Sequence, residues 1–486
     1  MIKNDTGLYT AFKSKDVRFD GRFFVGVSST GIYCRPVCRA RQPKIENCTF
    51  FYTAAEAENA GYRPCLLCRP ELAPGSSITD ATSVLAQKTA RILEENCGNA
   101  QSLAELAAQL GCTDRHLRRA FAAEFHVSPV QYLQTCRLLL TKNLLTDTGL
   151  SVIDVAMASG FGSLRRFNDA FKTHYRLSPS ALRRQTTEKN MKDSNITVSL
   201  GYRPPYLWDD VIKFLSGRVI PGIDMVKDDM YWRTAHFRNA ENEDVYGWIK
   251  VYHNAGKNSL RITVSEALLP VLPQVLGKLR HMFDLYCEPQ IIYQTLSSMN
   301  EIHPDLCKLG TRLPGCFDDF EMAVRAVLGQ QISVKAASTL AGRLVSKYGT
   351  PIRTGVDGLT HVFPSPEKIL ALKDTIEHDF GILGITSARS KTIMYLADAF
   401  THKEISFGIC SNPEEEVMKL LRIPGIGSWT AQYIAMRTMA WTDAFLETDV
   451  GVKKALAPYT PRESLKIAEA WRPWRSYAVM NLWNSL

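Results

Sequence analysis

The chain has 486 residues, a formal net charge of +9, 45% hydrophobic residues and 22% charged residues. This composition excludes a disordered or collagen-like chain, and the lack of any apolar run of about 18 residues excludes a membrane span. The length predicts roughly three domains, and the N-terminal residues carry no apolar segment typical of a signal peptide. We therefore expect a cytoplasmic protein whose 12 cysteines are thiols or metal ligands rather than disulfides.

Charged and aromatic residues are distributed unevenly along the chain. Residues 1–185 contain 24 lysines and arginines against 16 aspartates and glutamates, which gives this part a net charge of +8. The remainder is close to neutral, but it contains all eight tryptophans, from Trp208 to Trp483. The basic first part favours a polyanionic partner, and the contrast indicates that the two parts have different functions.

Two polar, turn-rich segments divide the chain, at residues 74–77 and 186–193. A cysteine-rich segment precedes the first, and short amphipathic helices are predicted between the two. After the second, strand-like alternation is mixed with helical stretches, and from about residue 305 only helical patterns follow. We expect a multidomain α+β protein with domains at 1–76, 80–185, 195–305 and 306–486. The predicted strands of the third domain are 196–200, 246–251 and 259–264, with helical stretches at 206–216 and 267–285.

Four cysteines form two close pairs, Cys34 with Cys38 and Cys65 with Cys68. Two such pairs can present four thiolates tetrahedrally to one Zn²⁺ ion at about 2.3 Å. The alternative is a set of buried thiols without a metal. The many cations beside the pairs argue against it, because buried thiols would not need them. These cations are Arg35, Arg39, Arg41, Arg63 and Arg69.

The segments 30–41 and 61–68 resemble the N-terminal domain of the Ada adaptive-response proteins, over about residues 8–75. The resemblance implies a small zinc domain in which the Cys34 thiolate accepts a methyl group from a methylphosphotriester in DNA. Cys38, Cys65 and Cys68 would be the other zinc ligands, and Thr30, Arg39, Arg41 and Arg63 would contact DNA. Methylation would change the formal charge of the centre from −2 to −1, and we hypothesise that DNA binding then tightens.

An internal repeat lies between the two polar segments, because Ser128-Pro129 and Ser178-Pro179 are 50 residues apart and each follows a basic helix. Tandem helix-turn-helix units fit this spacing. The first has helices at 103–110 and from the cap Thr113 to about Glu124. The second has helices at 151–159 and about 163–174. Residues 80–185 resemble the all-α AraC-type DNA-binding domain. The candidate contacts to phosphates or base edges, each alternatively a solvated side chain, are Arg115, Arg118, Arg119, Arg165 and Arg166.

A Pro-Gly-Ile-Gly turn at Pro424–Gly427 precedes a helical pattern in the second half. Gly425 and Gly427 allow a tight turn that exposes backbone N–H groups at a helix start, which suits a DNA phosphate. The alternative for the turn alone is a helix–helix connection. With residues 445–451 downstream it resembles the helix-hairpin-helix of DNA glycosylases. Further segments resemble the AlkA 3-methyladenine glycosylases, with their α+β (TBP-like) N-terminal domain and all-α glycosylase domain. They are 202–206, 283–289, 312–315, 325–333 and 471–478, and the resemblance covers about 196–486.

The resemblance implies that Asp449 is the catalytic aspartate and that Trp429, Tyr433 and Trp483 line the base pocket. A flipped-out, positively charged alkylated base would stack on electron-rich rings. Asp449 would stabilise an oxocarbenium-like sugar and orient or deprotonate water. The alternative for Asp449 is a helix N-cap.

Two positions depart from related enzymes. Trp429 stands where bifunctional glycosylases carry a catalytic lysine, so we expect a monofunctional enzyme without a lyase step. Gln331 stands where AlkA has a leucine that fills the gap left by the flipped base, so either Gln331 or Ile332 is the wedge. This half shows no four-cysteine pattern, so we expect no Fe–S cluster. As in the family, the hairpin carbonyls would hold a monovalent cation.

The sequence thus predicts a fusion of an alkylation sensor, a transcription-factor domain and a glycosylase that removes 3-methyladenine or 7-methylguanine from double-stranded DNA. The alternative is a methylation-activated transcription regulator with a weak or vestigial glycosylase. A third hypothesis is that the first part only tethers the chain to DNA, without methyl transfer. Expected partners are alkylated and operator DNA and, for an activator, RNA polymerase, with no membrane. The expected location is the bacterial cytoplasm, at the nucleoid.

Overall fold

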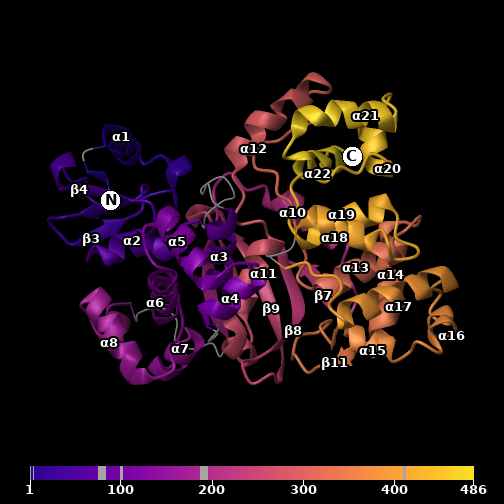
Figure 1. Ribbon diagram of the computed structural model, residues 1–486, viewed down its shortest axis with the longest axis horizontal. Coiled ribbons are helices and arrows are strands. Elements are labelled where there is room, and N and C mark those ends of the chain that lie inside the picture. The colour runs from indigo at the N-terminus through magenta and orange to yellow at the C-terminus, as the bar shows by residue number, and fades with distance from the viewer. Residues whose placement is uncertain (1, 4, 75–83, 99–101, 187–194, 409–411) are drawn as a thin grey trace.

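The computed structural model describes residues 2–3, 5–74, 84–98, 102–186, 195–408 and 412–486. A small N-terminal sheet and a group of helices lie on one side, a second sheet is central, and a large helical body lies on the other side (Figure 1). The predicted breaks and the domain limits placed on them lie largely outside these residues. In the described part of the chain, no helix is long and apolar enough to cross a membrane.

The N-terminal sheet has the strand order β1-β4-β2-β3-β5. β3 and β5 pair in parallel, with Ile32 opposite Arg63. Cys34 ends β3 and Cys65 directly follows β5, so the parallel pairing brings the two cysteine pairs to the same end of the sheet. The elements are α1 (Thr6–Ser14), α2 (Ala54–Asn59), β1 (Ile2–Lys3), β2 (Phe24–Val27), β3 (Ile32–Cys34), β4 (Cys48–Phe51) and β5 (Arg63–Pro64).

The next helices form two helix-turn-helix units, as expected. The side chains of Ser102, Thr113, Ser151 and Ser163 each cap the helix that follows by accepting a backbone N–H bond. The first unit is α4 and α5 and the second is α7 and α8. The helices are α3 (Val84–Glu95), α4 (Leu103–Gln109), α5 (Asp114–Phe125), α6 (Pro129–Asp147), α7 (Val152–Ala158), α8 (Leu164–Tyr175) and α9 (Pro179–Thr186).

The helix α6 joins the two units and is the longest of this group, with 19 residues. Its consecutive residues Thr141, Lys142, Asn143, Leu144 and Leu145 are all buried. Five consecutive positions span more than one turn, so the end of α6 is enclosed on all sides. The cysteine-rich N-terminal segment contacts this helix through Cys65, and the central sheet contacts it through Ser199.

The central sheet is antiparallel, in the order β6-β10-β9-β8-β7. Alternate residues such as Ile249, Val251 and Ile262 are fully buried, which agrees with the period of a half-covered sheet. The three predicted strands are β6, β9 and β10, but β7 and β8 were not predicted. Bounds are β6 (Ile196–Gly201), β7 (Asp224–Lys227), β8 (Met230–Arg238), β9 (Asp244–Asn254), β10 (Ser259–Val264), α10 (Trp208–Ser216) and α11 (Leu272–Met282).

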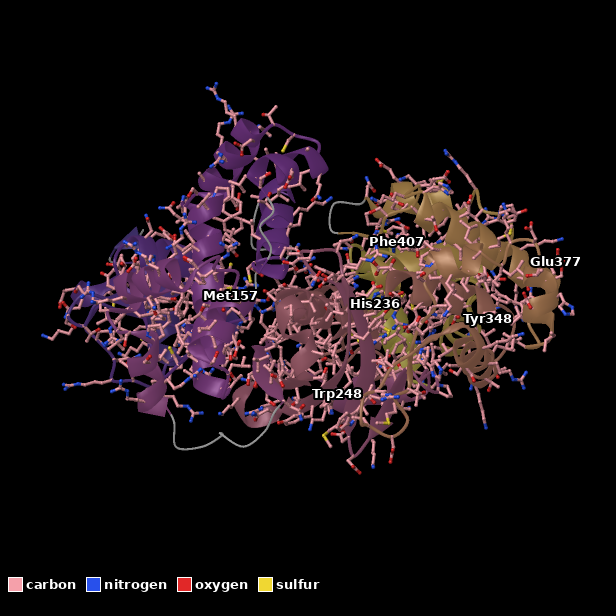
Figure 2. The ribbon with its side chains drawn as sticks, turned by 90° about the horizontal axis from the view of Figure 1, so that it is seen from below. Met157, His236, Trp248, Tyr348, Glu377 and Phe407 are labelled. Carbon is pink, nitrogen blue, oxygen red and sulfur yellow. The ribbon has the colours of Figure 1, made fainter. Side chains whose placement is uncertain are left out.

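The C-terminal body is helical, except for a two-stranded ladder of β11 (Thr350–Pro351) and β12 (His361–Val362). The expectation of helices alone after residue 305 is wrong here, because two-residue strands are too short to show alternation. Viewed from below, Met157 and Glu377 lie towards opposite ends of the molecule, with Trp248 of the sheet between them (Figure 2). The helices are α12 (Pro289–Leu296), α13 (Asp319–Leu328), α14 (Val334–Tyr348), α15 (Pro366–Leu370), α16 (Ile376–Gly381), α17 (Ser387–Thr401), α18 (Pro413–Leu420), α19 (Ser428–Thr438), α20 (Val450–Ala455), α21 (Pro461–Ile467) and α22 (Arg475–Asn484).

Candidate functional sites

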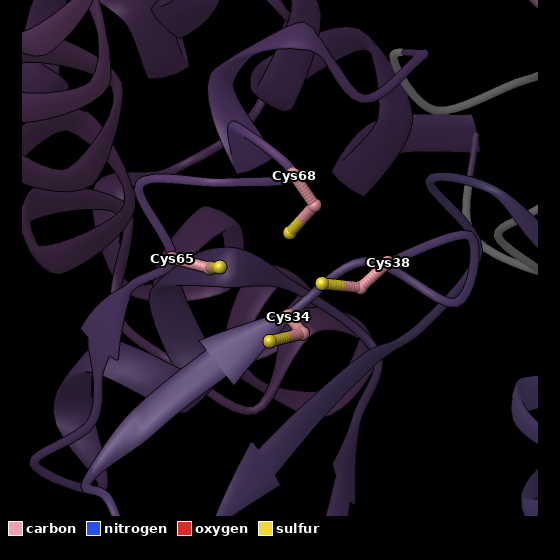
Figure 3. Close-up of side chains that lie close together, drawn as sticks. All are labelled: Cys34, Cys38, Cys65 and Cys68. Atoms are coloured by element: carbon pink, nitrogen blue, oxygen red, sulfur yellow. The ribbon is translucent and has the colours of Figure 1, made fainter. Parts of the chain in front are cut away.

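The four paired cysteines meet in one cluster at the end of the N-terminal sheet (Figure 3). The Sγ atoms of Cys34, Cys38, Cys65 and Cys68 all lie within 4.8 Å of one another. A tetrahedral Zn²⁺ site with bonds of about 2.3 Å separates its sulfur atoms by about 3.8 Å. The cluster therefore fits one zinc ion with little rearrangement, and this domain binds one Zn²⁺ through its four cysteines.

Neighbouring groups shape the cluster. The backbone N–H of Arg35 donates to Cys68 Sγ at 3.4 Å, and that of Ala40 donates to Cys38 Sγ at 3.5 Å. Hydrogen bonds among the four thiols raise the pKa of Cys34 and lower that of Cys65. Metal binding replaces such shared protons. By contrast, burial alone raises the pKa of Cys48 to about 11, as expected for an ordinary core thiol.

The arginines near the cluster fall into two groups. Arg35 forms a buried ion pair with Asp20, and Arg69 pairs with Glu71 and Asp147, so these two cations hold the fold. Within the part of the chain that the structure describes, the residues predicted to contact DNA form no such ion pair. Thr30, Arg39 and Arg41 are exposed, and Arg63 is half-buried.

The arginines of α5 and α8 all lie on exposed positions: Arg115, Arg118, Arg119, Arg165 and Arg166. Arg118 is 2.9 Å from Asp114 on the same helix, and Arg119 contacts His116. Exposed ion pairs of this kind contribute little free energy, so a DNA phosphate could replace the Asp114 carboxylate as the partner of Arg118. Both the DNA-contact and the solvated-face interpretations require this exposure, and the assignment stays a prediction.

Asp449 and three aromatic rings form one group in the C-terminal body. The Trp429 Nε1–H donates to Asp449 Oδ2 at 3.1 Å, and the Trp483 Nε1–H donates to Oδ1 at 2.9 Å. Oδ1 also accepts the backbone N–H groups of Gly451 and Val452, so Asp449 is the N-cap of α20 as well. Trp429 and Tyr433 stack at 5.1 Å, one turn apart on α19. The structure thus brings the four predicted residues together. It shows that Asp449 is a helix N-cap, and the catalytic role of this carboxylate stays a prediction.

Two further residues of this group come from the region of the central sheet and were not predicted. Phe214 of α10 stacks on Trp483 at 6.2 Å, and the Arg218 guanidinium lies 3.7 Å above the Phe214 ring. More than 200 residues separate them from Trp429, so no motif spacing could connect them.

Burial favours a higher pKa for Tyr433, but the positive charges of Arg437, Arg218 and Arg325 outweigh it, so the pKa of Tyr433 lies below its usual value.

The hairpin before α19 has a constrained turn and an open helix start. Gly425 has φ +91°, and a Cβ there would lie 2.0 Å from Thr392 Oγ1, so this position requires glycine. Gly427 is the N-cap of α19 and offers no side-chain cap, and a Cβ there would meet nothing within 4 Å. The first N–H groups of α19 are therefore available to an anion. The Pro424 and Gly425 carbonyls accept bonds from Thr392 and Gln330, and the cation at the hairpin stays a prediction.

Gln331 lies at the turn between α13 and α14. It has a left-handed φ of +56° and is exposed, whereas the neighbouring Ile332 is half-buried. The Arg389 guanidinium donates a hydrogen bond to the Gln330 carbonyl oxygen and so stabilises the turn. Of the two wedge candidates, Gln331 is the one that extends further into solvent.

The fold and these sites define a class of protein that combines a Cys₄ metal domain, tandem helix-turn-helix units and a glycosylase fold. Residues 7–71 match the family described as the metal binding domain of Ada. Residues 106–185 match a helix-turn-helix domain, and residues 197–318 match the AlkA N-terminal domain.

Relatives span the same combination. The chain is 35% identical to the probable bifunctional transcriptional activator/DNA repair enzyme AlkA of Mycobacterium tuberculosis, over 98% of this chain and 96% of that protein. It is 32% identical to DNA-3-methyladenine glycosylase 2 of Escherichia coli, over 59% of this chain and 96% of that protein. It is 36% identical to the bifunctional transcriptional activator/DNA repair enzyme Ada of Escherichia coli, over 30% of this chain and 40% of that protein. The chain belongs to the family of bifunctional AlkA-type transcriptional activators and DNA repair enzymes.

Proposed function

We propose that this chain removes alkylated bases such as 3-methyladenine and 7-methylguanine from double-stranded DNA and also regulates transcription in response to methylation. The names of its relatives support both activities. The observation that carries the first is the Asp449 carboxylate held by two tryptophan N–H groups beside a stacked aromatic pair. This combination offers a negative charge for a sugar cation and flat rings for a base.

The residues act in sequence on a flipped nucleotide. Backbone N–H groups at the start of α19 bind a DNA phosphate, and Gln331 fills the gap left in the duplex. The alkylated base, positively charged at N3 or N7, stacks on Trp429 and Trp483. The glycosidic bond then breaks with its electron pair moving to the base, which neutralises the base and leaves a positive sugar. Asp449 stabilises that sugar and takes a proton as water adds to the sugar carbon.

Trp429 also supports a monofunctional reaction. It occupies the start of α19, where a lyase would need an amine to form a Schiff base. Its indole nitrogen has no nucleophilic lone pair and donates to Asp449. Borohydride trapping with DNA that contains an abasic site tests this assignment, and a trapped covalent complex would contradict it.

We propose Cys34 as the methyl acceptor. Zinc, when bound, supplies the positive charge that keeps the four sulfurs deprotonated. The Cys34 sulfur forms the new carbon–sulfur bond, the methyl–oxygen bond of the phosphotriester breaks, and the phosphodiester leaves as an anion. N–H···S bonds from Arg35 and Ala40 draw electron density from Cys68 and Cys38. Cys68 is more exposed than Cys34, so it is the rival acceptor. Mass spectrometry that finds the methyl group on Cys68 would overturn the assignment.

Base-release profiling on alkylated DNA tests the glycosylase against the alternative of a regulator with a vestigial enzyme. We expect release of 3-methyladenine and 7-methylguanine, ranked together with hypoxanthine in one assay. No release by the full chain would leave the regulator alternative, for which operator DNA and RNA polymerase are the proposed partners. Asp449 accepts hydrogen bonds from two backbone N–H groups and two tryptophan N–H groups, and this intact arrangement supports a functional active site rather than a vestigial one.

A further inference from the structure

The loop that carries Cys65 and Cys68 rests on α6, the helix that joins the two helix-turn-helix units. Lys142 of α6 donates from Nζ to the carbonyl oxygen of Cys65 at 3.2 Å and forms an ion pair with Glu71. The side chains of Lys142 and Glu71 are only 1% and 2% exposed. Buried charges persist only where they are paired and hydrogen-bonded, so this arrangement is specific.

Arg69, the residue after Cys68, makes a second attachment. Its Nε is 2.8 Å from Glu71 and its Nη1 is 2.8 Å from Asp147, at the end of α6. Arg69 has a left-handed φ of +54°, an unfavourable conformation for a residue with a side chain. The surrounding ion pairs hold it there. The ligand loop therefore takes its shape from contacts that the helix-turn-helix domain supplies.

We propose that Lys142 is a positioning residue of the zinc site: from the helix-turn-helix domain it holds the loop of Cys65 and Cys68 in the geometry that binds the metal. The proposal rests on the Cys₄ zinc site and does not require methyl transfer. Coupling between two sites is reciprocal. Zinc binding therefore stabilises the docked end of α6 to the same extent that docking strengthens zinc binding.

Another contact of α6 provides a matched control. Gln131, near the start of the helix, donates to Asn59 of α2 at 2.7 Å and is exposed. It joins the same two domains but touches no ligand loop. Removing either contact would weaken the docking of the two domains. Only the removal of Lys142 would also disturb the geometry of the zinc ligands.

The first experiment is a Co²⁺ titration of the full chain, followed by zinc competition. A Cys₄ site reports through its thiolate-to-cobalt absorption bands, which shift when the ligand geometry changes. We expect Lys142→Met to weaken metal affinity by about tenfold and to shift the bands. Gln131→Ala should stay within about twofold of wild type. Glu71→Gln should weaken metal affinity less than Lys142→Met does, because Lys142 still donates its hydrogen bond to the Cys65 carbonyl oxygen. Glycosylase activity of each variant shows that the rest of the chain is folded.

The second experiment is hydrogen exchange of the wild-type chain with and without zinc, which needs no variant. We expect zinc removal to reduce protection at 141–147 of α6 and to leave α17 unchanged. The proposal would be overturned if Lys142→Met and Gln131→Ala bound metal with equal affinity. It would also be overturned if the exchange protection of α6 were the same with and without zinc. A wild-type chain that binds no cobalt would instead refute the metal site itself, and absent methyl transfer would refute only the proposed function of Cys34.

Discussion

Replacing Asp449 by asparagine separates the proposed catalytic role of its charge from its structural contacts. The asparagine carbonyl can keep the three donors that Oδ1 accepts, from Gly451, Val452 and Trp483. Its amide nitrogen then faces the Trp429 Nε1–H, so one hydrogen bond is lost, at about 1 kcal/mol of unfolding free energy. The missing charge matters more. At about 4 Å in a partly solvated site it contributes about 4 kcal/mol to a sugar cation, and its loss slows base release roughly a thousandfold.

Single-turnover release of 3-methyladenine from alkylated duplex DNA measures the effect. Asp318→Asn is a suitable control, because Asp318 caps α13 as Asp449 caps α20, but does not touch the aromatic group. We expect Asp318→Asn to release base close to the wild-type rate and Asp449→Asn to be slow while still binding duplex DNA. Equal release by Asp449→Asn and wild type would refute the catalytic assignment. Equal slowing in both variants would show that helix capping, not charge, is responsible.

Three further predictions concern other parts of the chain. Cys34→Ala should accept no methyl group from methylated DNA by intact-mass spectrometry, whereas Cys97→Ala, at a buried thiol outside the cluster, should accept one. Gly425→Ala should lower the thermal stability of the chain, because its Cβ would meet Thr392, whereas Gly427→Ala should keep the stability and weaken binding to duplex DNA, measured by fluorescence anisotropy. Burial raises the pKa of Glu58 from 4.5 to about 7, so the unfolded chain loses this proton first and stability should fall by about 3 kcal/mol as pH rises from 4.5 to 7. Glu58→Gln should remove that fall in unfolding experiments at pH 5 and 8, and an unchanged pH dependence would contradict the assignment.

Local signals explain why part of the fold could be predicted closely. The helix-turn-helix elements begin where Ser102, Thr113, Ser151 and Ser163 stand, because each hydroxyl satisfies a backbone N–H that a helix start leaves unpaired. The cysteine spacing was equally informative, since four thiolates have few other reasons to occur in two close pairs. Each of these signals is local, because it lies at one helix start or within one close pair of cysteines.

Long-range contacts left no such signal. Phe214 belongs to the helical stretch predicted at 206–216, and Arg218 follows that stretch. The pattern predicts a helix but not its neighbour, the aromatic group of α19 and α22. Lys142 belongs to a helical stretch in which a lysine is ordinarily solvated, and only the position of Glu71 in the fold explains its burial. The strands β7 and β8 were missed because Asp228 and Asp229 between them are typical of a loop.

The net charge of the first part of the chain has a structural explanation that the count of arginines does not give. Arg35, Arg69 and Lys142 are neutralised by buried carboxylates, and Arg22 pairs at 2.8 Å with Glu288 of the second part. Within the first part, such pairs remove one positive and one negative charge each and leave the net value unchanged. The excess therefore resides on side chains such as those of α5 and α8, which face solvent. Net charge therefore points to this solvent-facing surface as the place where we expect DNA phosphates to bind, whereas the ion pairs of Arg35 and Arg69 hold the zinc domain in place.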